Sequence, residues 1–129
     1  MNLKNNKLVK SLSDLKTLSL FYKSQKKTIV MTNGCFDILH SGHTYILEES
    51  KKLGDILIVA LNSDLSVRKI KSKDRPIVGE LDRAYVLSCL SAVDHIILFD
   101  DDSPENIICE ILDELKPLKN KTYKNLITY

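Results

Sequence analysis

Runs of apolar residues alternate with amphipathic segments along the chain, and the two patterns have different periods. Uninterrupted aliphatic and β-branched runs predict buried strands at residues 28–33, 55–61 and 94–99. Apolar residues spaced every three or four positions predict helices at residues 11–24, 43–53, 80–91 and 104–115. Because strands alternate with helices, the expected fold class is α/β, a Rossmann-like three-layer arrangement around a parallel sheet.

The ends of the chain differ in character from this alternating part. Residues 1–26 are predicted to form an N-terminal helical extension that packs on the sheet, with residues 1–7 fraying and Ser11 or Ser13 capping the helix. Residues 118–129 form a polar, basic tail. We find no repeat and no linker long enough to separate domains, so a single domain over residues 1–129 is expected.

Composition narrows the possible partners. The 129 residues carry a net charge of +2 and few aromatic residues, which disfavours a nucleic-acid partner. The apolar run at residues 56–61 is far shorter than the roughly 20 residues that cross a bilayer, so no membrane contact and a cytoplasmic location are expected. Three widely spaced cysteines indicate reduced thiols, with Cys89 and Cys109 as small core residues and the backbone of Cys35 mattering more than its sulfur.

The most informative chemistry lies at residues 32–43, Thr-Asn-Gly-Cys-Phe-Asp-Ile-Leu-His-Ser-Gly-His, where a buried strand ends in a glycine turn and a helix begins. His40 and His43 are three apart and share a helix face, and Gly42 leaves room for a phosphate at the helix N-terminus. The alternatives are surface histidines or half of a zinc site. No cysteine or carboxylate stands at ligand spacing nearby, so phosphate binding is favoured and no protein-held metal is expected.

This segment resembles the signature of the cytidylyltransferase-like nucleotidyltransferases, His-x-Gly-His preceded by Gly-Cys-Phe-Asp. The full phrase is most similar to the adenylyltransferase that makes ADP-heptose from heptose 1-phosphate and ATP, found alone or fused to a sugar kinase. Residues 66–76 resemble the basic substrate loop of the heptose enzymes, and residues 92–104 resemble the third strand and exit loop of the family. The similarity covers about residues 8–117.

The resemblance implies a role for each matching residue. The catalytic residues would be His40, His43 and Arg83. The nucleotide would be bound by Thr32, Asn33, Gly34, Cys35, Phe36, Gly42, Asn62 and Asp64. The acceptor substrate would be bound by Asp37, Lys69, Lys71 and Arg75.

Some of these residues also have simpler interpretations. Residues 68–75 have the composition of a solvated charge run, although their place after a strand end favours a binding role. Asp64 is well placed to cap the following turn, and Arg83 equally fits an ordinary helix surface. His95 is expected to be structural.

The implied reaction is attack of a sugar-phosphate oxygen on the α-phosphorus of ATP, with pyrophosphate as the leaving group. Mg²⁺ would be held mainly by the nucleotide phosphates, with Asp37 nearby. The product would be ADP-heptose, a precursor of the lipopolysaccharide core. Two alternatives stay open: a cytidylyltransferase acting on an alcohol phosphate such as glycerol 3-phosphate, and a nucleotide-binding remnant that does not turn over.

The family pattern continues with a further strand, a Lys-Gly-x-Asp-Tyr segment and a Ser-Thr-Thr turn, which this sequence does not contain, so we expect a fold truncated on its C-terminal side. That truncation would leave the strand at residues 28–33 near a sheet edge. Residues 125–129 are predicted to supply a short replacement strand, or a second copy in a homodimer is expected to complete the pocket.

Overall fold

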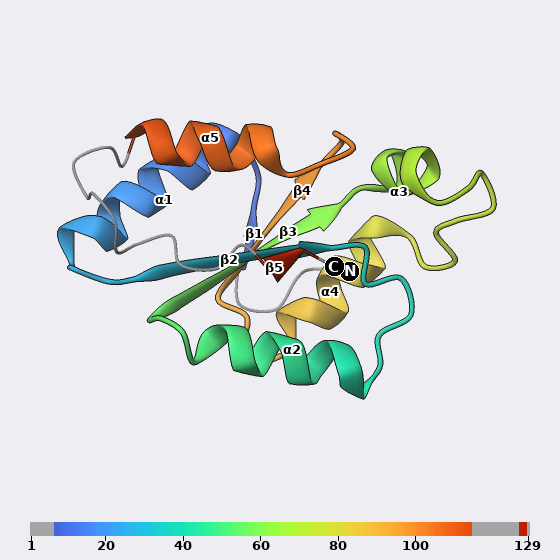
Figure 1. The fold of residues 1–129 in the computed structure, drawn as a ribbon, viewed down its shortest axis with the longest axis horizontal. Coiled ribbons are helices and arrows are strands. Elements are labelled where there is room, and N and C mark those ends of the chain that lie inside the picture. The colour runs from blue at the N-terminus through green and yellow to red at the C-terminus, as the bar shows by residue number, and fades with distance from the viewer. Residues whose placement is uncertain (1–6, 115–126, 129) are drawn as a thin grey trace.

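A parallel sheet runs through the centre of the molecule in the computed structural model, which describes residues 7–114 and 127–128 (Figure 1). Its five strands lie in the order β1-β4-β3-β2-β5. The bounds are β1 (Leu8–Val9), β2 (Ile29–Gly34), β3 (Ile56–Asn62), β4 (His95–Phe99) and β5 (Ile127–Thr128). Every neighbouring pair is parallel, so the carboxyl ends of all five strands meet at one edge.

Helices cover both faces of this sheet. Figure 1 shows α1 (Leu12–Ser24) and α5 (Glu105–Glu114) on one face, and α2 (Ser41–Lys51) and α4 (Glu80–Ser88) on the other. The short helix α3 (Asp64–Ile70) lies at the carboxyl edge, directly after β3. The three-layer α/β architecture expected from the sequence is therefore confirmed.

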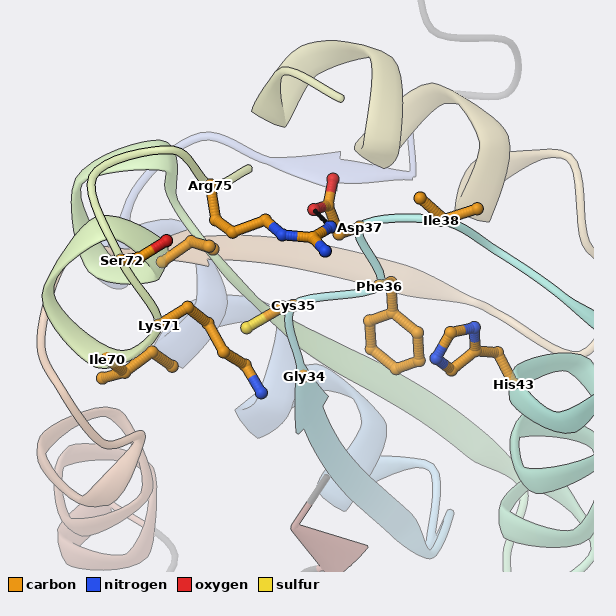
Figure 2. Close-up of a pocket in the computed structure, with 11 residues that line it drawn as sticks. Gly34, Cys35, Phe36, Asp37, Ile38, His43, Ile70, Lys71, Ser72 and Arg75 are labelled. Atoms are coloured by element: carbon orange, nitrogen blue, oxygen red, sulfur yellow. Dashed lines mark hydrogen bonds and ion pairs between the residues drawn. The ribbon is translucent and has the colours of Figure 1, made fainter. Parts of the chain in front are cut away.

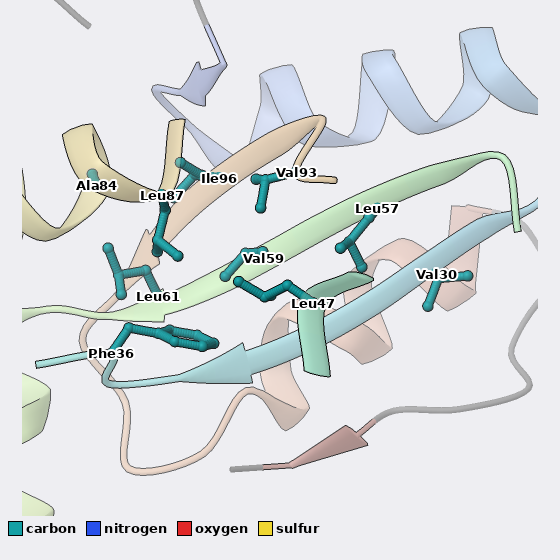
Figure 3. Packing of buried hydrophobic residues seen from close by; sticks show 10 residues of the cluster. All are labelled: Val30, Phe36, Leu47, Leu57, Val59, Leu61, Ala84, Leu87, Val93 and Ile96. Carbon is teal, nitrogen blue, oxygen red and sulfur yellow. The ribbon is translucent and has the colours of Figure 1, made fainter. Parts of the chain in front are cut away.

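Two hydrophobic clusters fix the helices to the sheet. On the α2 and α4 side, Leu47 and Leu87 pack against alternate residues of β3, among them Leu57 and Val59 (Figure 3). The other cluster includes the intervening β3 residues and the apolar stripes of α1 and α5: Leu15, Ile58, Ala60, Ile107 and Ile111. β3 is thus buried on both faces, which explains why it has no polar alternation.

The three predicted strands are confirmed to within one residue, and four predicted helices are present with ends that differ by up to three residues. Two elements were missed. β1 has only two residues, and its pairing with β4 is a long-range contact that no local pattern reveals. α3 falls in the segment interpreted as a basic loop. Lys7, expected to fray, donates from Nζ to the Leu90 carbonyl at 2.9 Å.

The second edge of the sheet corrects another expectation. β2 is an inner strand, because Thr32 and Asn33 pair with Ile127 and Thr128 of β5. The predicted replacement strand therefore forms at residues 127–128, while residues 125, 126 and 129 lie outside the described part of the chain.

The expectation that Cys89 and Cys109 are core residues was wrong, because both are exposed and only Cys35 is partly covered. Apolar neighbours in sequence misled the interpretation: Cys89 lies just beyond α4, and Cys109 lies on a side of α5 away from Ile107 and Ile111.

No helix within the described residues has the length and apolarity needed to span a membrane.

Candidate functional site

A cavity of about 560 Å³ opens at the carboxyl edge of the sheet, beside the end of β2 (Figure 2). Its walls come from the loop after β2, from α2 and from α3 with the loop that follows it. The lining residues are Gly34, Cys35, Phe36, Asp37, Ile38, His43, Val67, Ile70, Lys71, Ser72 and Arg75. This is the edge at which open α/β sheets bind their ligands.

His40 and His43 cap the N-terminus of α2 reciprocally. His40 is the N-cap, and its Nδ1 accepts from the Gly42 N–H at 3.1 Å. The His43 Nδ1 in turn accepts from the His40 N–H at 3.3 Å. A pair of imidazoles therefore does the work that Ser and Glu side chains do in the common capping box.

This capping determines the tautomer of both rings. An imidazole nitrogen that accepts an N–H carries no proton of its own, so in the neutral ring the proton resides on Nε2. Both His40 and His43 consequently present an Nε2–H donor. The rings lie 3.9 Å apart between centroids at an angle of 30°. His43 lines the cavity, whereas His40 is exposed beside it and is not among the lining residues.

The surroundings favour the neutral form of His43. Partial burial, and to a smaller extent the neighbouring His40, lower the pKa of His43 below the ordinary histidine value. The Phe36 ring packs edge-on against His43 with centroids 5.3 Å apart. Gly42 is required beside the pair, because a Cβ there would lie 2.9 Å from the His40 Cε1.

The loop after β2 bends sharply at Phe36, whose φ of 47° is in the left-handed region. Its ring folds back over Gly34, where a Cβ would lie 2.8 Å from the Phe36 Cε2. The bend places the Phe36 ring between His43 of the cavity wall and the hydrophobic cluster on the α2 and α4 side of the sheet. A strained backbone of this kind is common where a loop shapes a ligand site.

Arg83 lies behind this loop rather than in the cavity. Its side chain is 2% exposed. Nη2 contacts the Asp64 carboxylate at 2.8 Å, and the other nitrogens donate to backbone carbonyls. Those carbonyls belong to Val78, Cys35 and Asn62.

Asp37 also makes structural contacts. Its carboxylate accepts from the N–H groups of Ile77 and Val78 at 2.9 and 2.8 Å, and from Arg75 at 3.1 Å. Burial raises the pKa of Asp37, but these two N–H groups and Arg75 outweigh it and hold the pKa below the ordinary value. Asp37 therefore joins the loop after β2 to the segment that precedes α4.

The three basic residues predicted to bind the acceptor lie in different surroundings. Lys71 lines the cavity and extends toward Gly34 and Cys35 (Figure 2). Burial raises the pKa of the Cys35 thiol, while the nearby Lys71 charge opposes that rise. Arg75 lines the cavity as the partner of Asp37, whereas Lys69 donates to the Asp100 carbonyl at 3.3 Å and lies outside the cavity wall.

The polar residues at the end of β3 organise α3. The Asn62 Nδ2 donates to the Ser66 hydroxyl at 2.9 Å, and that hydroxyl donates to the Asp101 carbonyl at 2.6 Å. The N-cap of α3 is Ser63, not Asp64 as the sequence suggested. A serine at this position satisfies the Ser66 N–H, which leaves the Asp64 carboxylate for Arg83.

The remaining nucleotide candidates, Thr32 and Asn33, are buried inside β2 and do not line the cavity. Sequence reasoning in turn missed Ile38, Val67, Ile70 and Ser72, which complete the cavity wall. Their only signal was position: Ile38 lies inside the motif at residues 32–43, and the other three lie in the segment at residues 66–76.

A magnesium ion held mainly by protein side chains does not fit this site. Within residues 7–114 and 127–128, no group of three or more His, Cys, Asp or Glu side chains is arranged to hold a metal ion. Both Asp37 oxygens already accept hydrogen bonds.

Comparison with known proteins identifies relatives over most of the chain. The chain is 56% identical over 89 residues to "Bifunctional protein HldE" of Helicobacter acinonychis. The matched residues make up 69% of this chain and 19% of that protein. The protein of the same name from Campylobacter jejuni subsp. doylei is 46% identical over 124 residues, 94% of this chain and 25% of the relative. The chain thus spans a quarter or less of these relatives.

A solved structure agrees with the fold. The lipopolysaccharide core biosynthesis protein from Thermoplasma volcanium GSS1 matches with a TM-score of 0.56 and 40% identity, covering 64% of this chain and 66% of that one. The sequence model of the family described as cytidylyltransferase-like matches residues 31–127, which include the paired histidines and the cavity wall and end at the first residue of β5. The chain therefore belongs to the cytidylyltransferase-like family.

Proposed function

We propose that this chain transfers AMP from ATP to heptose 1-phosphate, giving ADP-heptose and pyrophosphate. Membership of the cytidylyltransferase-like family supports nucleotidyl transfer. The relative named for lipopolysaccharide core biosynthesis and the resemblance of residues 32–43 to the heptose adenylyltransferases support this acceptor. The proposal concerns only the activity of the part of the bifunctional relatives that this chain matches.

In this reaction an oxygen of the sugar phosphate forms a bond to the α-phosphorus of ATP, and the bond from that phosphorus to the bridging oxygen of the β-phosphate breaks. The attacking oxygen already carries negative charge near neutral pH, so no side chain has to remove a proton from it. Negative charge grows on the oxygens around the α-phosphorus and on the departing pyrophosphate. Catalysis then depends on positioning and on donors aimed at those oxygens.

The observation that carries the proposal is the reciprocal capping of His40 and His43. It holds both Nε2–H donors in place before a nucleotide arrives, so that little reorganisation is needed when charge develops. The lowered pKa of His43 favours the neutral ring, in which Nδ1 accepts the His40 N–H and Nε2 carries the proton to be donated. The N–H groups at the start of α2 add a favourable field for phosphate.

Lys71 supplies positive charge on the opposite wall of the cavity. We infer that it contacts a phosphate of the acceptor or of ATP, while the apolar Val67 and Ile70 face the less polar surface of the substrate. Mg²⁺ would enter as part of MgATP, with the phosphates and water as its ligands. A volume of about 560 Å³ is within the range of small-molecule sites.

The test is pyrophosphate release by the purified chain with Mg²⁺. The four combinations are ATP or CTP with heptose 1-phosphate or glycerol 3-phosphate. Release only in the combination of ATP with heptose 1-phosphate supports the proposal. Release with CTP and glycerol 3-phosphate would instead establish a cytidylyltransferase, and ATP binding without release in any combination would indicate a nucleotide-binding remnant.

A further inference from the structure

Arg83 joins three parts of the chain: the loop after β2, the junction of β3 with α3, and the segment just before α4. Its guanidinium donates to the Cys35 carbonyl at 2.6 Å, in the loop after β2, and to the Asn62 carbonyl at 2.7 Å, at the end of β3. Nε donates to the Val78 carbonyl at 2.8 Å, just before α4, and Nη2 contacts Asp64 at 2.8 Å, at the start of α3. These are the segments that surround the carboxyl edge of β2 and β3.

The surroundings of Arg83 argue against a direct contact with ATP. The side chain is 2% exposed and does not line the cavity, although Gly34, Cys35 and Phe36 on the other side of the loop do. A buried guanidinium is stable only when its donors are satisfied, and here Asp64 also compensates its charge. To reach a triphosphate, Arg83 would have to break most of these contacts.

The contact with Cys35 has a geometric consequence for the next residue. In a planar trans peptide the C=O and the following N–H point in opposite directions. Because the Cys35 carbonyl points at Arg83, the Phe36 N–H points away from Arg83, toward the side of the loop that borders the cavity. Within the part of the chain that the structure describes, no acceptor takes this N–H.

A second contact holds the same loop from the other end. The Val78 N–H donates to Asp37 at 2.8 Å while the Val78 carbonyl accepts from Arg83. The Glu80 carboxylate accepts from the Asp64 N–H at 3.0 Å, which ties the start of α3 to the start of α4. Arg83 is therefore the centre of a rigid support behind residues 35–37.

We propose that Arg83 is a positioning residue: through the Cys35 carbonyl it orients the Phe36 N–H toward the cavity, where that N–H donates to a phosphate oxygen of the nucleotide next to His43. The inference rests on the nucleotide site of the proposed function. It replaces the catalytic role that the family resemblance implied for Arg83. A lysine at position 83 would keep the positive charge, but its single ammonium group cannot donate to several carbonyls at once as the guanidinium does.

The direct test is the backbone amide signal of Phe36 in the ¹H–¹⁵N NMR spectrum of the full chain, titrated with MgATP and, separately, with inorganic pyrophosphate. In the wild type the Phe36 signal is expected to move on ligand addition, together with the Gly42 signal. In Arg83→Lys the Gly42 signal still moves, and the shift of Phe36 falls to less than about half. A Phe36 signal that stays unmoved in the wild type with both ligands overturns the inference.

Kinetics separate positioning from a contact with ATP. For Arg83→Lys we expect kcat to fall about 100-fold, the scale of a misplaced donor, with Kd for MgATP changed less than about threefold. A rise in Kd for MgATP that matches the fall in kcat would mean that Arg83 contacts the triphosphate and would overturn the proposal. Wild-type binding with no turnover would contradict the proposed function but leave the NMR result standing.

Two further variants control for stability. Ile58→Val removes one methyl group from the buried cluster on the α1 and α5 side and should lower the unfolding temperature without changing the Phe36 shift or kcat. Asp64→Asn keeps all three carbonyl acceptors of Arg83 but removes its charge partner, so we expect a fall in kcat smaller than that of Arg83→Lys. This variant replaces Arg83→Lys in the test if Arg83→Lys does not fold. Equal kcat values per folded molecule in the wild type, Asp64→Asn and Arg83→Lys would show that Arg83 is merely structural.

Discussion

Each histidine of the pair makes two kinds of interaction through its two nitrogens. Nδ1 caps the helix and Nε2 carries the proton that a phosphate oxygen can accept. Because capping and donation use different atoms, the folded helix itself favours the tautomer that leaves Nε2–H free to donate. The contributions of the two nitrogens to folding and to activity are therefore separable by substitution.

Replacement of His43 by Gln or Asn tests this separation. The Gln amide reaches the position of the imidazole Nε2–H, while the shorter Asn amide reproduces only the Nδ1 acceptor. We expect His43→Asn to lose about 100-fold or more in kcat, near the cost of one lost transition-state donor, and His43→Gln to lose clearly less. Initial rates of pyrophosphate release measure this.

Thermal unfolding is the control for both His43 variants. The unfolding temperature should fall by only a few degrees, because one capping interaction contributes about 1 kcal/mol. Equal activity of the wild type and His43→Asn would remove the central role given to the Nε2–H donor.

At the level of elements, α3 and the loop that follows it form the second wall of the cavity. The Ser66 hydroxyl and Lys69 attach this element to the loop after β4, while Asp64 attaches it to α4. Lys71 and Lys73 follow α3 with the same charge, but only Lys71 is among the lining residues. Electrostatic attraction at a distance should involve both lysines, whereas a direct substrate contact should involve Lys71 alone.

We therefore expect Lys71→Ala to raise KM for the phosphorylated acceptor about tenfold or more, the scale of one charge-assisted hydrogen bond. Lys73→Ala is the matched control and should change KM less than about twofold, because an exposed charge is screened by salt. Steady-state kinetics at fixed MgATP provide both values. Similar KM values in the two variants would mean that the segment after α3 is only a solvated basic surface.

At the scale of the whole molecule, short strands close both edges of the sheet. β1 pairs with β4, and β5 pairs with β2 beside the candidate site. Without β5, the N–H and C=O groups of β2 at Thr32 and Asn33 would face an open edge. β5 thus covers the edge of the strand from which the cavity-lining loop after β2 emerges.

A chain ending at residue 126 is expected to be less stable and more prone to self-association than the full chain. It would lose two residues of ladder and expose the edge of β2. Thermal unfolding and light scattering after size-exclusion chromatography measure both effects. The same chromatography tests the homodimer that we expect of the full chain. Unchanged stability and mass on truncation would mean that β5 contributes nothing to the sheet.

The stability of the whole chain should also depend on pH through His95, which contacts the Tyr22 hydroxyl at 2.7 Å. Burial, opposed by the nearby Asp94 charge, lowers the pKa of His95 from 6.5. The unfolded chain then binds more protons just below pH 6.5, so the contribution of His95 is complete above that pH and is lost as the pH falls. His43 acts in the same direction.

We therefore expect the unfolding temperature to fall between pH 7.5 and pH 5.5, and to fall less steeply in His95→Gln, which cannot titrate. Differential scanning calorimetry across this range measures both slopes. Parallel pH profiles for the wild type and His95→Gln would show that His95 does not titrate during unfolding.

The local patterns of the sequence predicted much of this arrangement. The β2, β3 and β4 strands are buried aliphatic runs, and α1, α2, α4 and α5 have helical apolar spacing, so their existence follows from short segments. The segment containing His40, Gly42 and His43 was equally recognisable, because strand, turn and helix N-terminus are contiguous in the chain. Their places at the start of α2 agree with that prediction.

Other roles depended on contacts between distant residues. The order of the strands, the pairing of β5 with β2 and the burial of Arg83 beneath Cys35 join positions separated by dozens of residues. Asp37, which the sequence suggested as a substrate residue, turned out to accept from N–H groups some 40 positions away. The sequence by itself determined the elements, because they arise from local periodicity, and the paired-histidine motif, because its residues are contiguous in the chain. Only the tertiary structure decided which charged groups face the cavity and which support it, because long-range packing selects their partners.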